Sequence, residues 1–255
     1  MSSAGVFIQL LGPFQVLALG QPVSLRPGGK AEKLLACLAL QPRVGVSRDW
    51  LLEHIWPNSA TTLAGPCLNT LMHSLKDHLT DALAGQPPIL HMHGRYALNL
   101  TGGVGVDLLD FQSAVSAGDR LLAAGSTAAA IESYEQAVSL YRGELSAGSD
   151  ISDLLERERL RSICLTALAR LADAHFDLGN HTQAMNVVAR ILAIDPCRED
   201  AHRMAMRLNV RLGARSQALR QYELCRMILQ QELDAVPEPA TTRLAELIRS
   251  DPGQV

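Results

Sequence analysis

The sequence has no apolar run long enough to form a membrane-spanning helix. Its N-terminus shows no basic stretch followed by an apolar core, so we expect no secretory signal. The cysteines are few and scattered, and no two have the close spacing of a zinc or redox motif: Cys37, Cys67, Cys164, Cys197 and Cys225. Together these absences favour a cytoplasmic protein with reduced thiols and no contact with a membrane.

The sequence also lacks a complete catalytic or phosphate-binding motif. Gly28-Gly29-Lys30 resembles the end of a phosphate loop, but Ser24 stands where the first glycine is needed and Ala31 replaces the magnesium-binding hydroxyl. Spacing alone brings together no nucleophile with a base, and no pair of carboxylates. We therefore predict that the protein is not an enzyme and needs no cofactor.

Four histidines cluster in the sequence, at His73, His78, His91 and His93. The last two fall on one face of an expected strand, but no third or fourth ligand is well spaced, so surface histidines are favoured over a metal site. Cys67 lies in an expected helix without a basic neighbour to activate its thiol, and buried packing is favoured over redox sensing.

Basic charge is scarce overall, because 23 Lys and Arg stand against 26 Asp and Glu, for a formal net charge of −3. The charges are unevenly spread. Residues 1–103 carry seven Lys or Arg and five Asp or Glu, a balance of +2, which leaves −5 for residues 104–255. A mildly basic first part permits contact with nucleic acid but does not establish it.

The first part of the chain alternates between strand and helix patterns. Short apolar runs punctuated by glycine and proline predict a small antiparallel sheet, with strands over Val6–Leu10, Phe14–Leu17 and Val23–Leu25. Further on, Ile89–His93 and Tyr96–Leu100 alternate in the manner of strands around Gly94-Arg95, which predicts a compact hairpin.

Three helices are expected between this sheet and the hairpin. Apolar stripes place the first over Ala31–Leu40 and the third over Leu63–Leu79, with Pro66 in the first turn of the third. The second follows Ser47, a suitable N-cap, and runs to Trp56. A sheet, three helices and a hairpin are the layout of a winged helix-turn-helix, an α+β fold, which we assign to residues 1–101.

After an expected linker at Thr101–Gly105, the sequence pattern predicts repeating helices. Gly179 and Gly213 are 34 residues apart, and so are Ala184 and Ala218. A period of 34 residues, with small residues where helices cross, is typical of tetratricopeptide (TPR) repeats.

An earlier unit has the same internal spacing, at Gly125 and Ala130, but is offset by 54 residues because of an insertion expected at Gly143–Ser152. Three helix pairs with a closing helix near Thr241–Ile248 can bury a continuous core. We therefore predict a mostly α protein, in which the winged helix is followed by an all-α, TPR-like superhelix over residues 106–250.

Several short motifs occur in an order and spacing that are specific when taken together. In the first half they are Leu11-Gly12-Pro13-Phe14, Leu34-Leu35-Ala36, Leu52 with Trp56-Pro57, and Gly94-Arg95-Tyr96-Ala97-Leu98. In the second half they are Val106-Asp107 with Phe111, Tyr141-Arg142-Gly143, Ala201-His202-Arg203, and Ala218-Leu219-Arg220-Gln221-Tyr222. With these motifs the chain resembles the SARP (antibiotic regulatory protein) type of transcriptional regulator. In that family an OmpR/PhoB-type winged helix precedes a TPR-like bacterial transcriptional activator domain.

The resemblance implies a bacterial transcription activator that binds direct repeats near promoters and recruits RNA polymerase or a sigma factor. It implies a location in the cytoplasm, at the nucleoid, and it is compatible with a homodimer.

In such a head the third helix enters the major groove of double-stranded DNA. With Leu68, Met72, Leu75 and Leu79 directed inward, the residues expected to face DNA are Asn69, Thr70, His73, Ser74 and Lys76. Asn69 is suited to bridge an adenine edge, and Lys76 to contact guanine or phosphate. The candidates for further backbone or minor-groove contacts are Arg95 at the hairpin and Arg26, Lys30 and Lys33 near the first helix.

The third helix departs from the family pattern, in which two or three arginines are common around Ser74–Asp77. This chain has Ser74, Lys76 and Asp77 there, and fewer cations should weaken phosphate binding. An alternative hypothesis is therefore a protein-interaction adaptor whose winged helix has lost or weakened its hold on DNA. Control by a ligand or partner is a further possibility.

TPR stacks form a concave groove that suits a peptide or helix and is lined by the first helix of each pair. We expect this groove to mediate self-association or contacts with another protein. The residues expected to line it are His175, Asp177, His202, Arg203 and Arg207.

Overall fold

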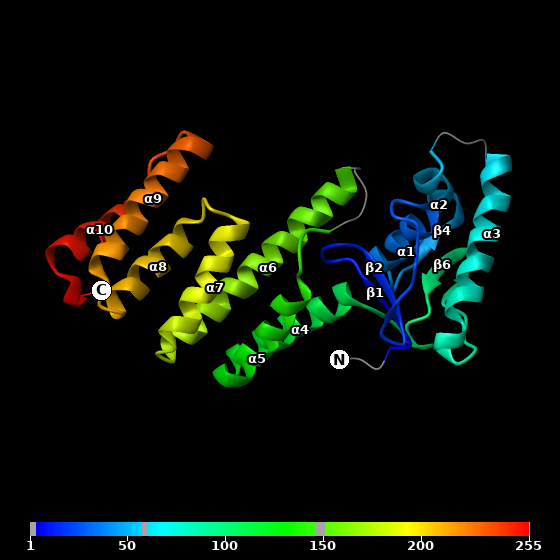
Figure 1. The fold of residues 1–255 in the computed structure, drawn as a ribbon, viewed down its shortest axis with the longest axis horizontal. Coiled ribbons are helices and arrows are strands. Elements are labelled where there is room, and N and C mark those ends of the chain that lie inside the picture. Colours follow the sequence, from blue (N-terminus) through cyan, green and yellow to red (C-terminus); the bar gives the residue numbers. More distant parts are fainter. Residues whose placement is uncertain (1–3, 58–60, 146–150, 255) are drawn as a thin grey trace. The chain divides into compact units, whose positions relative to one another are not determined.

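The structure is a computed structural model that describes residues 4–57, 61–145 and 151–254 (Figure 1). The chain divides into two compact units, one comprising Met1–Ser113 with Ser139–Leu160 and the other Ala114–Val138 with Arg161–Val255. Most described residues are helical, and the small sheets belong to the first unit. The expected fold class, small N-terminal sheets and helices followed by an all-helical stack, is confirmed.

The first sheet has the strand order β3-β2-β1-β7. Its central strand β1 (Val6–Gln9) pairs with antiparallel β2 (Gln15–Ala18) on one side and with parallel β7 (Val104–Val106) on the other. The edge strand β3 covers Gln21–Pro22, so the strand predicted at Val23–Leu25 is wrong: the observed strand lies just before it in the sequence. The expected linker is also corrected, because its last two residues belong to β7.

Three helices follow the sheet: α1 (Lys30–Leu40), α2 (Arg48–Ile55) and α3 (Thr61–Leu79). The Ser47 hydroxyl accepts a hydrogen bond from the Trp50 amide, which confirms the predicted N-cap of α2. Because α3 begins at Thr61, Pro66 lies in its second turn and not, as predicted, in its first. A proline there cannot bond the carbonyl four residues earlier, so this part of α3 is weakened.

The second sheet contains the predicted hairpin, with β5 (Ile89–Met92) paired to β6 (Arg95–Leu98) and the short β4 (Val46–Ser47) on the other side of β6. A 3-10 turn, η1 (Asp81–Leu83), connects α3 to β5. His93 and Gly94 form the two-residue turn, one residue earlier than the predicted Gly94-Arg95. Their φ values of 52° and 74° are the positive values that a tight hairpin of right-handed twist requires.

A buried carboxylate joins the first sheet to the start of α4 (Asp107–Ala123). Asp107 is fully buried and accepts hydrogen bonds from the amides of Leu10 at 2.8 Å and Leu11 at 3.0 Å. The Arg142 guanidinium lies 3.4 Å from the same carboxylate. Burial raises the pKa of Asp107, while the two amides and Arg142 act to lower it.

The helical stack continues with α5 (Thr127–Leu140), α6 (Ile151–Asp177), α7 (His181–Ile194), α8 (Glu199–Arg211) and α9 (Arg215–Leu233). Gly125, Gly179 and Gly213 end α4, α6 and α8, and each has a φ of +75°. The amide that follows each glycine donates a hydrogen bond to the carbonyl five residues earlier. This is the Schellman motif, a helix C-terminus that favours glycine. The predicted repeat is therefore confirmed at three helix ends, although residues 146–150 of the predicted insertion lie outside the described residues.

Small residues occur where the paired helices cross, as the 34-residue period predicts. Ala130, Ala184 and Ala218 have no exposed surface. In the first pair, Tyr134 is also fully buried against Gly118, where an added Cβ would lie 2.6 Å from the tyrosine ring. Close packing of this kind fixes the distance between helices.

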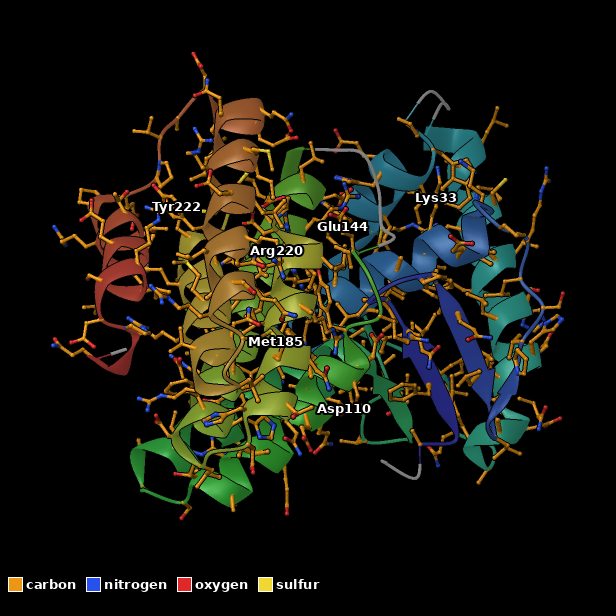
Figure 2. The ribbon with its side chains drawn as sticks, turned by 60° about the vertical axis from the view of Figure 1, so that its left-hand side comes forward. Lys33, Asp110, Glu144, Met185, Arg220 and Tyr222 are labelled. Atoms are coloured by element: carbon orange, nitrogen blue, oxygen red, sulfur yellow. The ribbon has the colours of Figure 1, made fainter. Side chains whose placement is uncertain are left out.

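The last helix, α10 (Pro239–Ser250), closes the stack and is followed by a short 3-10 turn, η2 (Pro252–Gln254). Its Leu244, Ala245 and Ile248 pack against Met206 of α8 and Tyr222 of α9, which is labelled in Figure 2. This agrees with the closing helix predicted near Thr241–Ile248.

Candidate nucleic-acid interface

Helix α3 presents a polar outer face. Its apolar Leu68, Leu75 and Leu79 are buried, and Met72 is half-buried. The five residues expected to face DNA are all exposed: Asn69, Thr70, His73, Ser74 and Lys76. Cys67 is exposed on the same helix, so its predicted buried packing is wrong.

An arginine that the sequence analysis did not single out connects α3 to its neighbours. Arg48, the first residue of α2, donates hydrogen bonds to the Asn69 side chain at 3.0 Å and to the Gly65 carbonyl at 3.0 Å, both on α3. It also donates to the Tyr96 hydroxyl of the hairpin at 3.1 Å. A lone arginine beside a helix N-cap gives no sequence signal of this role, because the contacts join residues far apart in the chain.

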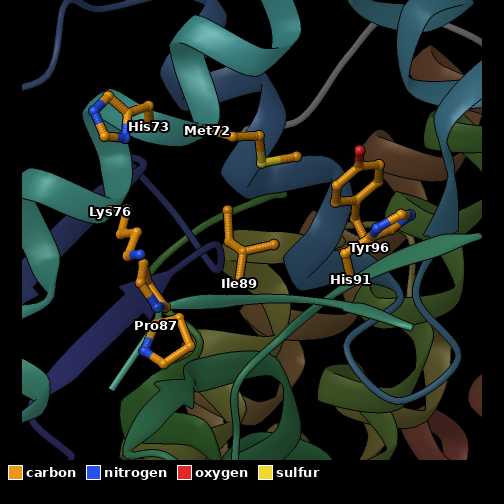
Figure 3. A pocket seen from close by; sticks show the side chains of 8 residues that line it. Met72, His73, Lys76, Pro87, Ile89, His91 and Tyr96 are labelled. Atoms are coloured by element: carbon orange, nitrogen blue, oxygen red, sulfur yellow. The ribbon is translucent and has the colours of Figure 1, made fainter. Parts of the chain in front are cut away.

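Between α3 and the hairpin lies a hollow of about 250 Å³ (Figure 3). Met72, His73 and Lys76 of α3 line one side, and Ile89, His91 and Tyr96 line the other, with Pro87 and Pro88 at the end. The His91 and Tyr96 rings stack with their centroids 4.4 Å apart. The hollow thus combines an apolar floor with an exposed ammonium group at its rim.

The basic charge of this face is reduced further by local pairing. The His73 ring nitrogen lies 3.6 Å from the Asp77 carboxylate one turn along α3, and both side chains are mostly exposed. Among the residues described on α3, Lys76 is the only lysine or arginine, and the acidic Asp77 follows it directly. The exposed face of α3 thus carries little basic charge, as the sequence indicates.

Two of the residues predicted to contact phosphates, Arg95 and Lys30, also bond carbonyls within the protein. Arg95 donates hydrogen bonds to the carbonyls of Val44 at 3.0 Å and Gly45 at 2.8 Å, which ties the hairpin to the preceding loop. The Lys30 ammonium donates to the Ile55 carbonyl and lies 5.4 Å from the centre of the Trp56 ring. A helix carbonyl and an aromatic face both attract a cation, so Lys30 serves the packing of α1 against α2.

Three other cations of the head are exposed. Arg26 and Lys33 are exposed near the start of α1, and Lys33 is labelled in Figure 2. Arg43, which the sequence analysis did not single out, is exposed in the loop whose carbonyls hold Arg95. Its position beside the hairpin comes from the β4–β6 pairing, a long-range contact that no local pattern reveals.

In the helical stack, the residues predicted to line a partner groove separate into buried and open groups. His175 and His202 are buried between helices, so their placement in the groove is corrected. The His202 ring bonds the Pro196 carbonyl at 2.9 Å and the Gln221 amide at 2.7 Å. Burial lowers the pKa of His202, against the opposing effects of the Pro196 carbonyl and nearby carboxylates.

Asp177 is exposed, whereas Arg203 and Arg207 border a hollow of about 300 Å³ between α6 and α8. Three alanines make room for it, Val188 and Ile191 of α7 form an apolar floor, and Asp173 and Asp200 add acidic walls. Burial raises the pKa of Asp173, and the carboxylates of Asp177 and Asp200 raise it further. Arg203 already bonds Glu238 and Thr241, both at 2.9 Å.

Neither a metal centre nor a membrane span is found in the described part of the chain. No three His, Cys, Asp or Glu side chains within residues 4–57, 61–145 and 151–254 come together as metal ligands do. Within the same ranges, every helix is too short or too polar to cross a bilayer.

The sequence matches known regulators over almost its whole length. Residues 106–249 match the family described as the bacterial transcriptional activator domain. The transcriptional regulator RedD of Streptomyces coelicolor is 30% identical over 262 residues, which cover 97% of this chain and 71% of RedD. The regulatory protein AfsR of the same organism is 26% identical over 246 residues, or 95% of this chain and 24% of AfsR. The chain thus spans about a quarter of the length of AfsR.

A solved structure shares the fold. EmbR of Mycobacterium tuberculosis, determined in complex with a low affinity phosphopeptide, matches with a TM-score of 0.76 at 22% identity. The match covers 96% of this chain and 65% of EmbR, so the fold is shared through both the winged helix and the helical stack.

Proposed function

This chain belongs to the bacterial transcriptional activator domain family and is a transcription regulator of the SARP type, and we propose that it binds double-stranded promoter DNA through its winged helix. The observation that carries the proposal is the polar, exposed face of α3 beside the hairpin, at Asn69, Thr70, His73, Ser74 and Lys76. A helix with such a face fits the major groove. Residues 1–101 would thus supply the DNA contacts.

The scarcity of cations sets the expected affinity. All six candidate cations are exposed, but Arg95 and Lys30 also bond carbonyls of the protein, which leaves Lys76, Arg26, Lys33 and Arg43 as the most readily available for phosphates. Each phosphate contact adds to affinity through the release of counterions, so one head should bind weakly. Two copies on neighbouring repeats would bind far more tightly, because the second head then binds at a high effective concentration. We therefore propose binding as a homodimer on repeated sites.

The helical stack, residues 106–250, would contact RNA polymerase or a sigma factor and so activate transcription. Its hollow between α6 and α8 supports a partner segment that carries an apolar side chain and a basic one. The apolar floor would take the first, and the Asp173 carboxylate, beside Asp177 and Asp200, would favour the second. Arg207, exposed at the rim, would take an acidic residue of the same segment.

A second candidate is a protein-interaction adaptor that no longer depends on DNA. It is favoured by Ser74 and Asp77 at the arginine positions of the family, and by the apolar floor of the hollow beside α3. Either function is that of a non-enzymatic cytoplasmic regulator that needs no cofactor. Under the first, the protein would act at the nucleoid.

A gel shift with the protein's own upstream DNA separates the two candidates. We expect a complex at low salt that unlabelled upstream DNA displaces more readily than an unrelated duplex does. Lys76→Ala should weaken the complex and lower the slope of log affinity against log salt by about one. Ser74→Ala, two residues away on the same exposed face and uncharged, is the matched control and should leave that slope unchanged. The absence of any complex at low salt would favour the adaptor.

A further inference from the structure

The guanidinium of Arg48 lies where α2, α3 and the hairpin meet. Its Nη1 donates to Asn69 Oδ1 at 3.0 Å and to the Tyr96 hydroxyl at 3.1 Å, and its Nη2 donates to the Gly65 carbonyl at 3.0 Å. The Asn69 contact is exposed, while the other two are partly buried. One side chain thus fixes two points of α3 and one point of the hairpin.

These contacts determine which way the Asn69 amide faces. A guanidinium has five N–H donors and no acceptor, so the amide atom turned toward Arg48 must be the oxygen. The amide NH₂ then faces away from Arg48. On the exposed side of α3 it can donate to an acceptor on a base edge, such as a purine N7 or a thymine O4.

The place where Arg48 binds α3 is also the weak point of that helix. Gly65 is costly within a helix, and Pro66 removes one backbone hydrogen bond. The missing side chain of Gly65 leaves room for the guanidinium, because a Cβ there would lie 3.3 Å from Nη2. The bond from Arg48 to the Gly65 carbonyl therefore adds a contact directly beside this weak point of the helix.

We propose that Arg48 is a positioning residue for DNA recognition, which presents the Asn69 amide as a hydrogen-bond donor and holds α3 in register with the hairpin. The proposal rests on the proposed DNA binding. In it, Arg48 acts through Asn69 and not through a phosphate. Its loss should reduce discrimination between bases without changing the number of counterions released.

The test measures affinities of the whole protein for its preferred duplex and for duplexes changed at one base pair, at several salt concentrations. We expect Arg48→Met to reduce discrimination about tenfold at the base pair that Asn69 reads, the size of one lost direct contact. The salt slope should stay unchanged. In an Asn69→Ala background, Arg48→Met should cause no further loss, because the residue through which it acts is absent.

Two further variants separate positioning from folding. Asn69→Asp keeps an oxygen acceptor for Arg48 but has no NH₂, so it should lose discrimination while its melting temperature is unchanged. Tyr96→Phe removes a different contact of Arg48 and should keep discrimination. If Arg48→Met unfolds the head, Arg48→Lys retains the charge but concentrates its three donors on one nitrogen, so it cannot make all three contacts of the guanidinium and should show the same loss of discrimination.

The outcomes that would overturn the proposal are distinct. If the unaltered protein binds a preferred sequence and Arg48→Met discriminates as well as it does, Arg48 does not position Asn69. A salt slope lowered by about one, with all duplexes weakened equally, would make Arg48 a phosphate contact instead. If the unaltered protein binds no DNA, the proposed function fails, and this inference fails with it.

Discussion

The helical stack is stabilised mainly by buried apolar contacts, whereas the surface of the head that would contact DNA is shaped by hydrogen bonds from arginine side chains. In the stack, Ala130, Ala184 and Ala218 are buried where helices cross. In the head, Arg48 joins α2, α3 and the hairpin, and Arg95 joins the hairpin to the preceding loop. The helix crossings of the stack and the candidate DNA-facing surface of the head thus depend on different interactions, although the head also has an apolar core and the stack also has bonds from arginine to helix carbonyls.

This difference predicts whether a substitution in each region affects stability or recognition. Packing in the stack repeats with the sequence period, so each crossing supports the next, and a substitution there should cost stability. Hydrogen bonds at an exposed surface contribute little to stability but determine direction. Substitutions of exposed residues on the α3 and hairpin surface should therefore change recognition more than folding.

The largest effect is expected for Tyr134→Ala in the first helix pair. Removal of this fully buried ring leaves a cavity beside Gly118 and should lower the free energy of unfolding by about 3–5 kcal/mol. Tyr134→Phe is the matched control: it keeps the ring and loses the 2.7 Å bond to Asp119, at a cost of about 1 kcal/mol. Urea unfolding followed by circular dichroism measures both. Equal losses in the two variants would mean that the hydroxyl, and not packing, holds this pair.

Asp107→Ala should have the next largest effect. The Asp107 carboxylate is fully buried, so its polar contacts should contribute to stability, unlike the exposed hydrogen bonds of the head. Its loss leaves the amides of Leu10 and Leu11 without acceptors and should cost about 2–4 kcal/mol. Asp107→Asn keeps one acceptor oxygen and should cost less. Hydrogen exchange at the two amides provides the measurement, and protection that survives in Asp107→Ala would contradict the account.

The stack also contains buried polar side chains, and acid should reveal the one at His202. Because burial lowers the pKa of His202, the unfolded chain binds a proton below pH about 6.5 that the folded chain excludes. Stability should therefore fall as the pH drops through that value, by at most about 1.4 kcal/mol per pH unit from this group. His202→Gln should flatten the dependence between pH 7 and 5, as measured by urea unfolding. An identical pH dependence in both proteins would place the ring in water.

The smallest effects are expected for two lysines of the head that are three residues apart, Lys30 and Lys33, one of which should affect stability and the other DNA binding. Both lysines are exposed, but Lys30 also bonds the Ile55 carbonyl and lies over Trp56. Lys30→Ala should lower the melting temperature and leave the salt dependence of DNA binding unchanged. Lys33→Ala should do the reverse, with a salt slope smaller by about one. The opposite assignment would show that α1 faces DNA at Lys30.

The order of the elements and the repeat could be predicted from the sequence, because they depend on local patterns. Ser47 caps α2, and Gly179 and Gly213 end their helices, because each requires only the backbone of its own neighbours. The strand at Val104–Val106 could not be found, since its partner β1 lies almost a hundred residues earlier.

The candidate interface was predictable only in part, for the same reason. Helical spacing exposes Asn69 and Lys76, but it says nothing of the partners of Arg95 and Lys30, which are carbonyls brought near by folding. Arg48 was missed because its importance comes from three contacts on two other elements. The residues that orient a site are harder to read from a sequence than those that face outward.

The most direct test of the account is the affinity of the whole protein for its own upstream duplex, measured by fluorescence anisotropy between about 50 and 200 mM salt. We expect sequence-preferring binding with a negative slope of log affinity against log salt that is shallow for a DNA-binding protein. The few exposed cations of the head would produce such a slope. No binding at the lowest salt, or binding that does not depend on salt, would contradict a head that recognises DNA.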